Sequence, residues 1–151
     1  MPSTGIHGIT GIIAASLIPN EYGKLGAVIG SIIPDADLLV GSIGYLITKN
    51  VNVPKKIHRT FTHSYIIHFG IALSGSLLFF AGWNSAGLFL MCTALMMAIH
   101  STTDFCYIAF MILKDYNNGI LPGIAMFAPI SMKKKALCAR VFSNRVYNLL
   151  L

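Results

Sequence analysis

Histidine and aspartate are the side chains of this sequence that could do chemistry, and both are scarce. The 151 residues include five histidines and five acidic residues. Neutral imidazole and carboxylate together suit zinc, manganese or iron, and carboxylates can bridge two ions in a hydrolytic centre. We therefore predict a site for one or more divalent metal ions, most readily zinc, whose candidate ligands are His7, Asp35, Asp37, His58, His63, His100 and Asp104.

The spacing of two pairs suggests how they could converge. His100 and Asp104 are four residues apart, so on a helix both side chains point the same way. They could share an ion, or simply hydrogen-bond to each other. Asp35 and Asp37 would diverge on a regular helix, but a turn after Pro34 can bring both toward one point. An ordinary acidic turn at a helix end is the alternative interpretation.

The segment 58–64 reads His-Arg-Thr-Phe-Thr-His-Ser. Its two histidines, His58 and His63, are five residues apart, which fits a loop entering a helix better than one helical face. Ser64 or Thr62 could cap that helix.

Arg59 lies inside the same segment and could act in two ways. Its planar guanidinium can donate two hydrogen bonds to a phosphate, or it can anchor the chain at a membrane interface. His68 lies deeper in the following apolar stretch. We interpret it as a packed, hydrogen-bonded core histidine and leave it out of the ligand set.

The composition places these residues in a membrane protein. Hydrophobic residues make up 55% of the chain and charged residues 11%, with a mean hydropathy of +0.71. An average soluble domain carries charge on about a quarter of its residues. The net charge of +6 comes from basic residues in linkers and the tail, without a nucleic-acid reader motif.

The apolar segments predict an all-α fold, a small polytopic bundle of about four membrane-embedded helices. We expect residues 1–131 to form a membrane-embedded catalytic domain and residues 132–151 a basic interfacial tail. The first segment has about fourteen residues, fewer than the roughly 20 that span a membrane. The clearest spans are the last two, which should form an antiparallel pair around a turn at Asn84-Ser85. The predicted segments are 5–18, 23–33, 38–47, 64–83 and 86–113.

A chain that crosses a membrane and returns over equal helical lengths brings its motifs back to one level. On this basis all seven candidate ligands share one membrane face. Basic residues gather at the same end, whereas the opposite turns offer Glu21 and Lys24. The positive-inside rule then places the site on the cytoplasmic side of the plasma or inner membrane.

These motifs, in this order, resemble the YdjM-like family of membrane-bound, predicted metal-dependent hydrolases. The resemblance covers roughly residues 5 to 131. It rests most on the segment 58–64, and also on Pro34-Asp35-Ala36-Asp37, on His7, and on His100 with Asp104, followed by a segment from Gly119 to Pro129. The family is considered distantly similar to zinc-dependent phospholipase C and P1-type nucleases, which implies phosphoester hydrolysis by analogy.

The function we expect is therefore hydrolysis of a phosphoester in a lipid or another membrane-associated substrate by metal-activated water. Arg59 would stabilise the phosphoryl charge, and an aspartate not used as a ligand, Asp35 or Asp37, would act as general base. The alternatives are a metal-ion or proton transporter, and an inactive adaptor stapled by its metal. Leu38 and Thr60 depart from the family pattern, which fits the adaptor.

Overall fold

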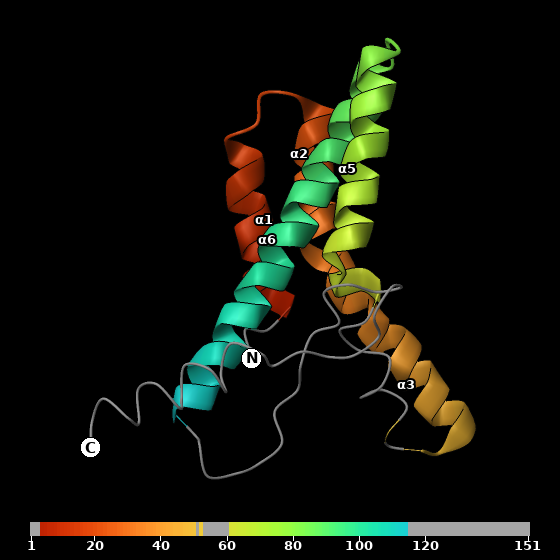
Figure 1. The fold of residues 1–151 in the computed structure, drawn as a ribbon, viewed down its shortest axis with the longest axis vertical. Helices are drawn as coiled ribbons and strands as arrows, with labels where there is room; N and C mark the ends of the chain where they lie inside the picture. The colour runs from red at the N-terminus through yellow and green to blue at the C-terminus, as the bar shows by residue number, and fades with distance from the viewer. Residues whose placement is uncertain (1–3, 51, 53–60, 115–151) are drawn as a thin grey trace.

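A computed structural model of the chain describes residues 4–50, 52 and 61–114, and every element in these ranges is helical, as predicted (Figure 1). Two short 3-10 turns, η1 and η2, lie between the longer helices. The elements in chain order are α1 (Thr4–Ser16), α2 (Glu21–Ile32), η1 (Ile33–Ala36), α3 (Asp37–Thr48), η2 (Phe61–His63), α5 (Tyr65–Phe80) and α6 (Asn84–Lys114).

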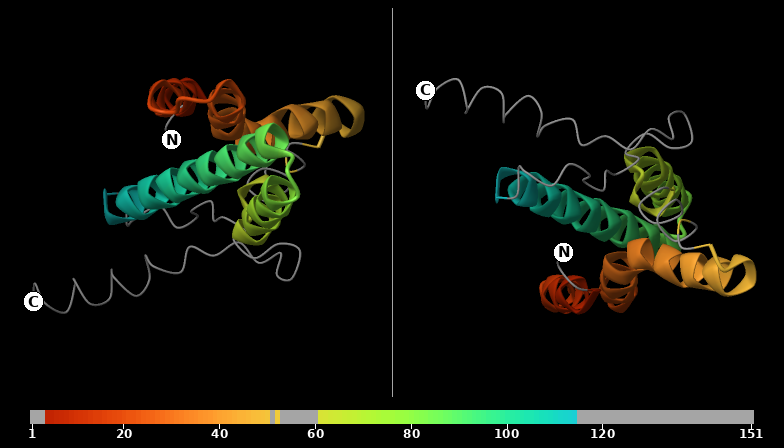
Figure 2. Two further views of the ribbon diagram at one scale, coloured as in Figure 1. Left: turned by 90° about the horizontal axis from the view of Figure 1, so that it is seen from above. Right: turned by 90° about the horizontal axis from the view of Figure 1, so that it is seen from below.

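The helices pack as a row in which α6 lies between α2 and α5, and α1 packs against α2 (Figures 1 and 2). Helix α3 continues from η1 and projects away from this row. The α1–α2 and α5–α6 turns lie toward one end of this row. At the other end, the start of α1, the end of α2 and the start of α5 lie beside the second half of α6.

Glycines allow α2 to approach α6 closely. A Cβ atom added at Gly26 would collide with the backbone oxygen of Phe89, and one added at Gly30 would collide with the backbone of Thr93. A larger side chain at either position would force the helices apart.

Glycine also allows α5 and α6 to approach closely. A Cβ on Gly75 would lie 2.9 Å from the backbone oxygen of Gly87. Gly70, in contrast, faces open space and takes no part in this contact.

The turn between α5 and α6 comes earlier than predicted. The chain reverses at residues 81–83, where Gly82 has a φ of 91°, and Asn84 and Ser85 already belong to the first turn of α6. Glycine adopts this left-handed conformation without a steric penalty, so it ends the preceding helix before Asn84-Ser85, the pair that the sequence predicts as the turn.

Pro34 ends α2 at Ile32, and the chain continues as η1 before α3 begins at Asp37. Two stretches are long and apolar enough to cross a membrane, Glu21–Thr48 and Asn84–Tyr107. Helix α1 is short, as expected. Helix α5 has 16 residues, fewer than the 64–83 span predicted, because the turn at Gly82 shortens it.

The distribution of polar and apolar side chains is the reverse of that in a water-soluble protein. A small apolar core forms around Ala15, Ala27 and Met96. Most of the other buried side chains are histidine, aspartate, serine or threonine, whereas large apolar residues such as Phe80, which is 87% exposed, cover the outside. An exterior of this kind is compatible with the hydrocarbon core of a membrane. The buried polar side chains are candidates for a functional site.

Candidate metal centre

The structure brings six of the seven predicted ligands together in one buried cluster at one end of the bundle. They come from five elements, of which only η1 and α3 directly adjoin each other in the sequence. Helix α1 contributes His7, η1 contributes Asp35, α3 contributes Asp37, η2 contributes His63, and α6 contributes His100 and Asp104. The remaining predicted residues, His58 and Arg59, lie outside the described residues, as do the 119–129 segment and the 132–151 tail.

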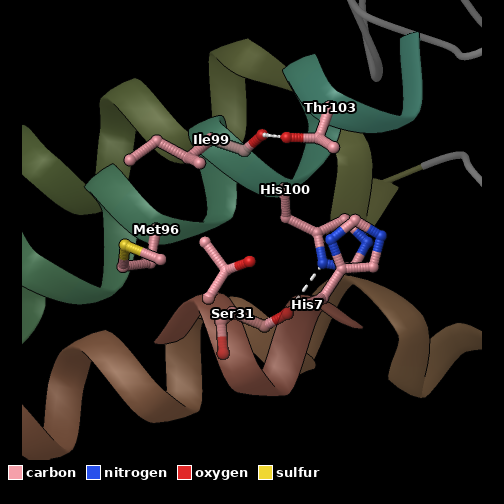
Figure 3. Close-up of a pocket in the computed structure, with 7 residues that line it drawn as sticks. His7, Ser31, Met96, Ile99, His100 and Thr103 are labelled. Atoms are coloured by element: carbon pink, nitrogen blue, oxygen red, sulfur yellow. Dashed lines mark hydrogen bonds between the residues drawn. The ribbon is translucent and has the colours of Figure 1, made fainter. Parts of the chain in front are cut away.

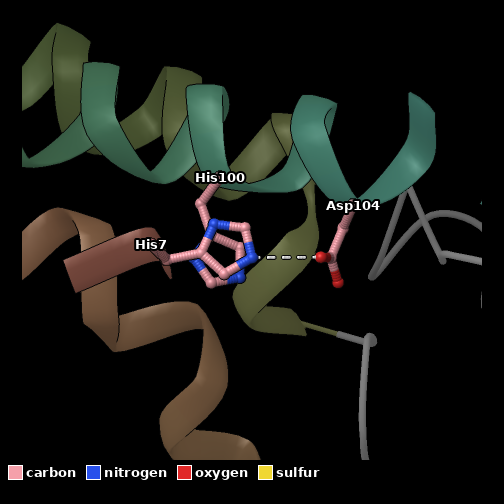
Figure 4. A group of neighbouring side chains, drawn as sticks. All are labelled: His7, His100 and Asp104. Atoms are coloured by element: carbon pink, nitrogen blue, oxygen red, sulfur yellow. Dashed lines mark hydrogen bonds and ion pairs between the residues drawn. The ribbon is translucent and has the colours of Figure 1, made fainter. Parts of the chain in front are cut away.

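His7 connects the first helix to the last. Its Nε2 atom lies 3.2 Å from Asp104 Oδ1, and its ring stacks on the ring of His100 with the centroids 3.7 Å apart (Figure 4). The N–H at Nε2 donates to the carboxylate. Both α6 residues point to the same side of the helix, as their spacing predicts, and that side faces His7.

A backbone carbonyl fixes the orientation of His100. The Nδ1 atom of His100 lies 2.7 Å from the carbonyl oxygen of Ser31 in α2 (Figure 3). A carbonyl can only accept, so Nδ1 carries the proton and Nε2 presents its lone pair when the ring is neutral. This Nε2 is buried without a hydrogen bond in the described part of the chain, and it lies 3.4 Å from Asp35 Oδ1. Metal-ligating histidines are typically oriented in this way.

His63 lies between two carboxylates. Its Nδ1 atom is 3.7 Å from Asp37 Oδ2, and its Nε2 atom is 3.7 Å from Asp104 Oδ2. Burial lowers the pKa of His63, but the carboxylates of Asp104 and Asp37 outweigh burial and raise the pKa above its usual value of 6.5. The cluster therefore attracts a positive charge to this position, either a proton or a cation.

Two hydrogen bonds support the cluster from outside. Thr62 Oγ1 donates to Asp37 Oδ2 over 2.8 Å, and His68 Nε2 donates to the carbonyl oxygen of Thr62 over 2.9 Å. His68 is thus a buried, hydrogen-bonded histidine outside the cluster, as we interpreted it. Ser64 takes the N-cap position of α5, while Thr62, the other capping candidate, holds Asp37 instead.

The donor set fits a divalent cation. Two groups of three buried residues have ligand atoms within 4.8 Å of one another, and both include His100. Ligand atoms at about 2.0–2.2 Å from a tetrahedral zinc ion lie about 3.3–3.6 Å apart, similar to the 3.2–3.7 Å nitrogen–oxygen distances here. The groups are His7 with His100 and Asp104, and Asp35 with His63 and His100.

The two groups cannot both use His100 at once, because its Nδ1 is already bonded to Ser31. Asp104 shows how two ions could nevertheless be held. Its Oδ1 faces His7 and its Oδ2 faces His63, which is the arrangement by which a carboxylate bridges two ions.

A small cavity of about 10 Å³ lies beside the stacked rings (Figure 3). That is close to the smallest volume that holds one water molecule. Its lining includes His7, Ser31 and His100. The cavity has no room for a phosphoester.

The sequence did not reveal the two supporting groups, Ser31 and Thr62. The carbonyl of Ser31 carries no side-chain signature. One signal lies three residues later, where Pro34 has no N–H and so cannot donate the 3-10 type hydrogen bond to this carbonyl. The sequence predicts Thr62 only as a helix-capping residue. Its hydrogen bond to Asp37 depends on the packing of α3 against η2, which the local sequence does not encode.

The fold and the cluster together define a helical membrane protein with a buried histidine–aspartate centre that could hold a metal ion. The family model described as "YdjM inner membrane protein" matches residues 1–151, so the chain belongs to that family. The resemblance to the YdjM family is confirmed, and the match covers the whole chain. Comparisons with curated proteins and with solved structures found no match.

Proposed function

We propose that this protein is a membrane-bound, metal-dependent hydrolase that cleaves a phosphoester of a lipid or another membrane-associated substrate. The observation that carries the proposal is the buried cluster of three histidines and three aspartates at one end of an apolar bundle. Burying this many ionisable groups costs several kcal/mol unless they are paired or bind a cation. Zinc is the proposed ion, because imidazole and carboxylate oxygen are its usual ligands in catalytic sites.

The chain's own residues have separable roles in this proposal. His7, His63, His100 and Asp104 hold the metal, which when bound lowers the pKa of a coordinated water and polarises a phosphoryl oxygen. Asp35 or Asp37, whichever is not a ligand, accepts a proton from the attacking water. Arg59, outside the described residues, is proposed to bind the phosphoryl group.

The position of the cluster fits a substrate that lies in the membrane. From Asn84 to Asp104, α6 rises about 30 Å, the thickness of the hydrocarbon core. The cluster therefore lies at the boundary opposite the α5–α6 turn. We propose that this boundary is cytoplasmic, because the basic residues of the sequence gather at the same end.

Labelling can test this orientation. In a background whose native cysteines are changed to serine, Lys49→Cys should react with an impermeant thiol reagent from the cytoplasmic side. Glu21→Cys should react from the other side, because Glu21 lies exposed at the opposite end. The reverse pattern would overturn the proposed orientation.

A second candidate is an inactive adaptor whose metal staples the helices. The small cavity beside the cluster favours it, because about 10 Å³ cannot admit a phosphoester. Metal content of purified protein by elemental analysis, combined with turnover of a panel of phosphoester lipids, separates the candidates. Metal with turnover supports the hydrolase, metal without turnover supports the adaptor, and protein that binds no metal contradicts both.

A further inference from the structure

Helices α5 and α6 form an apolar groove of about 660 Å³ on the outside of the bundle, a volume typical of small-molecule sites. Tyr65 and His68 line it at the end nearest the metal-centre candidate, and Ser76 and Leu88 at the other end. Several lining residues are themselves exposed, including Phe69 at 70%. The groove therefore opens onto the surface that faces lipid. We refer to it below as the α5–α6 groove.

We propose that the α5–α6 groove binds one acyl chain of a phospholipid whose headgroup lies at the metal-centre end. This inference deepens the proposed function and rests on it for the identity of the lipid as substrate. Binding of the chain itself requires neither metal nor hydrolysis.

The groove is about as long as an acyl chain of one leaflet. Tyr65 and Ser76 are separated by about 16 Å of helix, close to half of the roughly 30 Å hydrocarbon core. On the facing helix, Leu88 and Ala98 span about 15 Å. With Asp104 at the membrane boundary, the groove runs along α6 from about 9 Å inside that boundary at Ala98 to about 24 Å at Leu88, so an acyl chain that enters from this end would cross the midplane within the groove.

The polar atoms of the groove support placing the lipid headgroup at the metal-centre end. His68 is only 3% exposed, and its Nδ1 makes no hydrogen bond in the described part of the chain. Because Nε2 of the same ring donates to the carbonyl of Thr62, Nδ1 is an acceptor. It could accept a hydrogen bond from a hydroxyl or ammonium of the lipid at this end. Tyr65, whose hydroxyl pairs with Thr102 over 2.8 Å, adds a second polar group there.

The same end is connected to the cluster. His68 bonds to Thr62, and Thr62 bonds to Asp37, so two hydrogen bonds separate the wall of the groove from a candidate ligand. A lipid in the groove would therefore present its phosphate close to the metal-centre candidate. Its acyl chain would remain in an apolar environment, so moving from the bilayer into the groove would expose none of its apolar surface to water.

Photo-crosslinking tests the proposal directly. Full-length protein is reconstituted in phosphatidylglycerol vesicles that contain a trace of phosphatidylglycerol with a diazirine in the middle of one acyl chain, and labelled peptides are mapped by mass spectrometry. We expect labelling at residues in the middle of the groove, such as Cys92. Ala72→Phe, which fills the groove from α5, should abolish this labelling, whereas Leu73→Phe, on the neighbouring exposed position, should leave it unchanged.

Circular dichroism and thermal unfolding establish whether each variant folds, and Ala98→Leu fills the groove from α6 if Ala72→Phe does not fold. Groove labelling that persists in the filled variants would overturn the proposal. Absence of groove labelling in the wild type would also overturn it and indicate that another part of the chain or a second copy covers the groove. Because the readout involves no turnover, a failed hydrolase assay would leave a positive result intact.

Discussion

The imidazole rings of His7 and His100 stack with 3.7 Å between their centroids and 22° between their planes. Two protonated rings at this distance would repel each other strongly in a buried site. Coordination to a metal uses the neutral form of imidazole, which carries no such charge. The two residues come from the first and last described helices, so the stack also joins the ends of the fold.

Replacement of His100 should have the largest effect on metal binding, because this residue belongs to both groups of candidate ligands. For His100→Ala we expect metal affinity to fall by more than the roughly 10–100-fold that loss of an outer-shell partner costs. Competition with a chromophoric chelator measures the affinity. Cys106→Ser, which removes an exposed thiol from the same helix, is the control and should bind as tightly as the wild type. Equal affinities for all three proteins would contradict the assigned centre.

Thr62 should support metal binding through Asp37. Thr62→Val removes the hydroxyl that donates to Asp37 Oδ2 and keeps the shape of the side chain. We expect metal affinity to fall by about 10–100-fold. Thr62→Ser keeps the hydroxyl and should restore most of the affinity. A loss in both variants would show that the methyl group, rather than the hydrogen bond, matters.

His63 should titrate above its usual range in the metal-free protein. The carboxylates of Asp104 and Asp37 favour its protonated form, which raises its pKa above 6.5. A ¹H–¹³C NMR titration of the histidine rings should show this midpoint, assigned by its loss in His63→Ala. Asp37→Asn removes one of the carboxylates and should lower the midpoint.

The sign of the pH effect on metal binding follows. Above the pKa of His63 the ring is neutral and available to a metal, whereas below it a proton competes for the same site. Metal affinity should therefore decrease as the pH falls through this midpoint. A midpoint at or below 6.5, or an affinity that rises on acidification, would contradict the geometry around His63.

The sequence could predict that the candidate ligands lie at one membrane level, because the rise per residue of an α-helix is constant. Equal lengths of helix on either side of the turns place His7, Asp35 and Asp104 at one level regardless of how the helices pack. Pro34 marked the end of α2 correctly. The turn near Gly82 was misplaced by a few residues, because several adjacent small and polar residues were each compatible with a turn.

The pairing inside the cluster could not be predicted in the same way. Which nitrogen of His63 faces Asp37, and which faces Asp104, depends on side-chain rotamers and on the angles at which η2 and α6 meet. The bond from His100 to the backbone of Ser31 is similarly a product of packing. The α5–α6 groove also escaped prediction, because its lining residues look like ordinary lipid-facing residues.

The close contact between α2 and α6 should make Gly30 sensitive to substitution. Gly30→Ala forces a Cβ atom against the backbone of Thr93, and overpacking of this kind costs about 1–3 kcal/mol. The free energy of unfolding in mixed detergent measures the effect. Gly70→Ala is the matched control, because it adds the same methyl group in open space and should stabilise its helix by about 0.5–1 kcal/mol. Equal effects of the two substitutions would contradict the packing.

The hydrogen bond between His7 and Asp104 joins residues 97 positions apart. A ribosome must therefore synthesise about the first two-thirds of α6 before the first histidine can meet its carboxylate. Until then, His7 and the two aspartates after α2 must be accommodated in a partly inserted chain by water, lipid headgroups or the insertion machinery. Any ion bound by the finished centre is thus acquired late in biogenesis, and it cannot template insertion of the earlier helices.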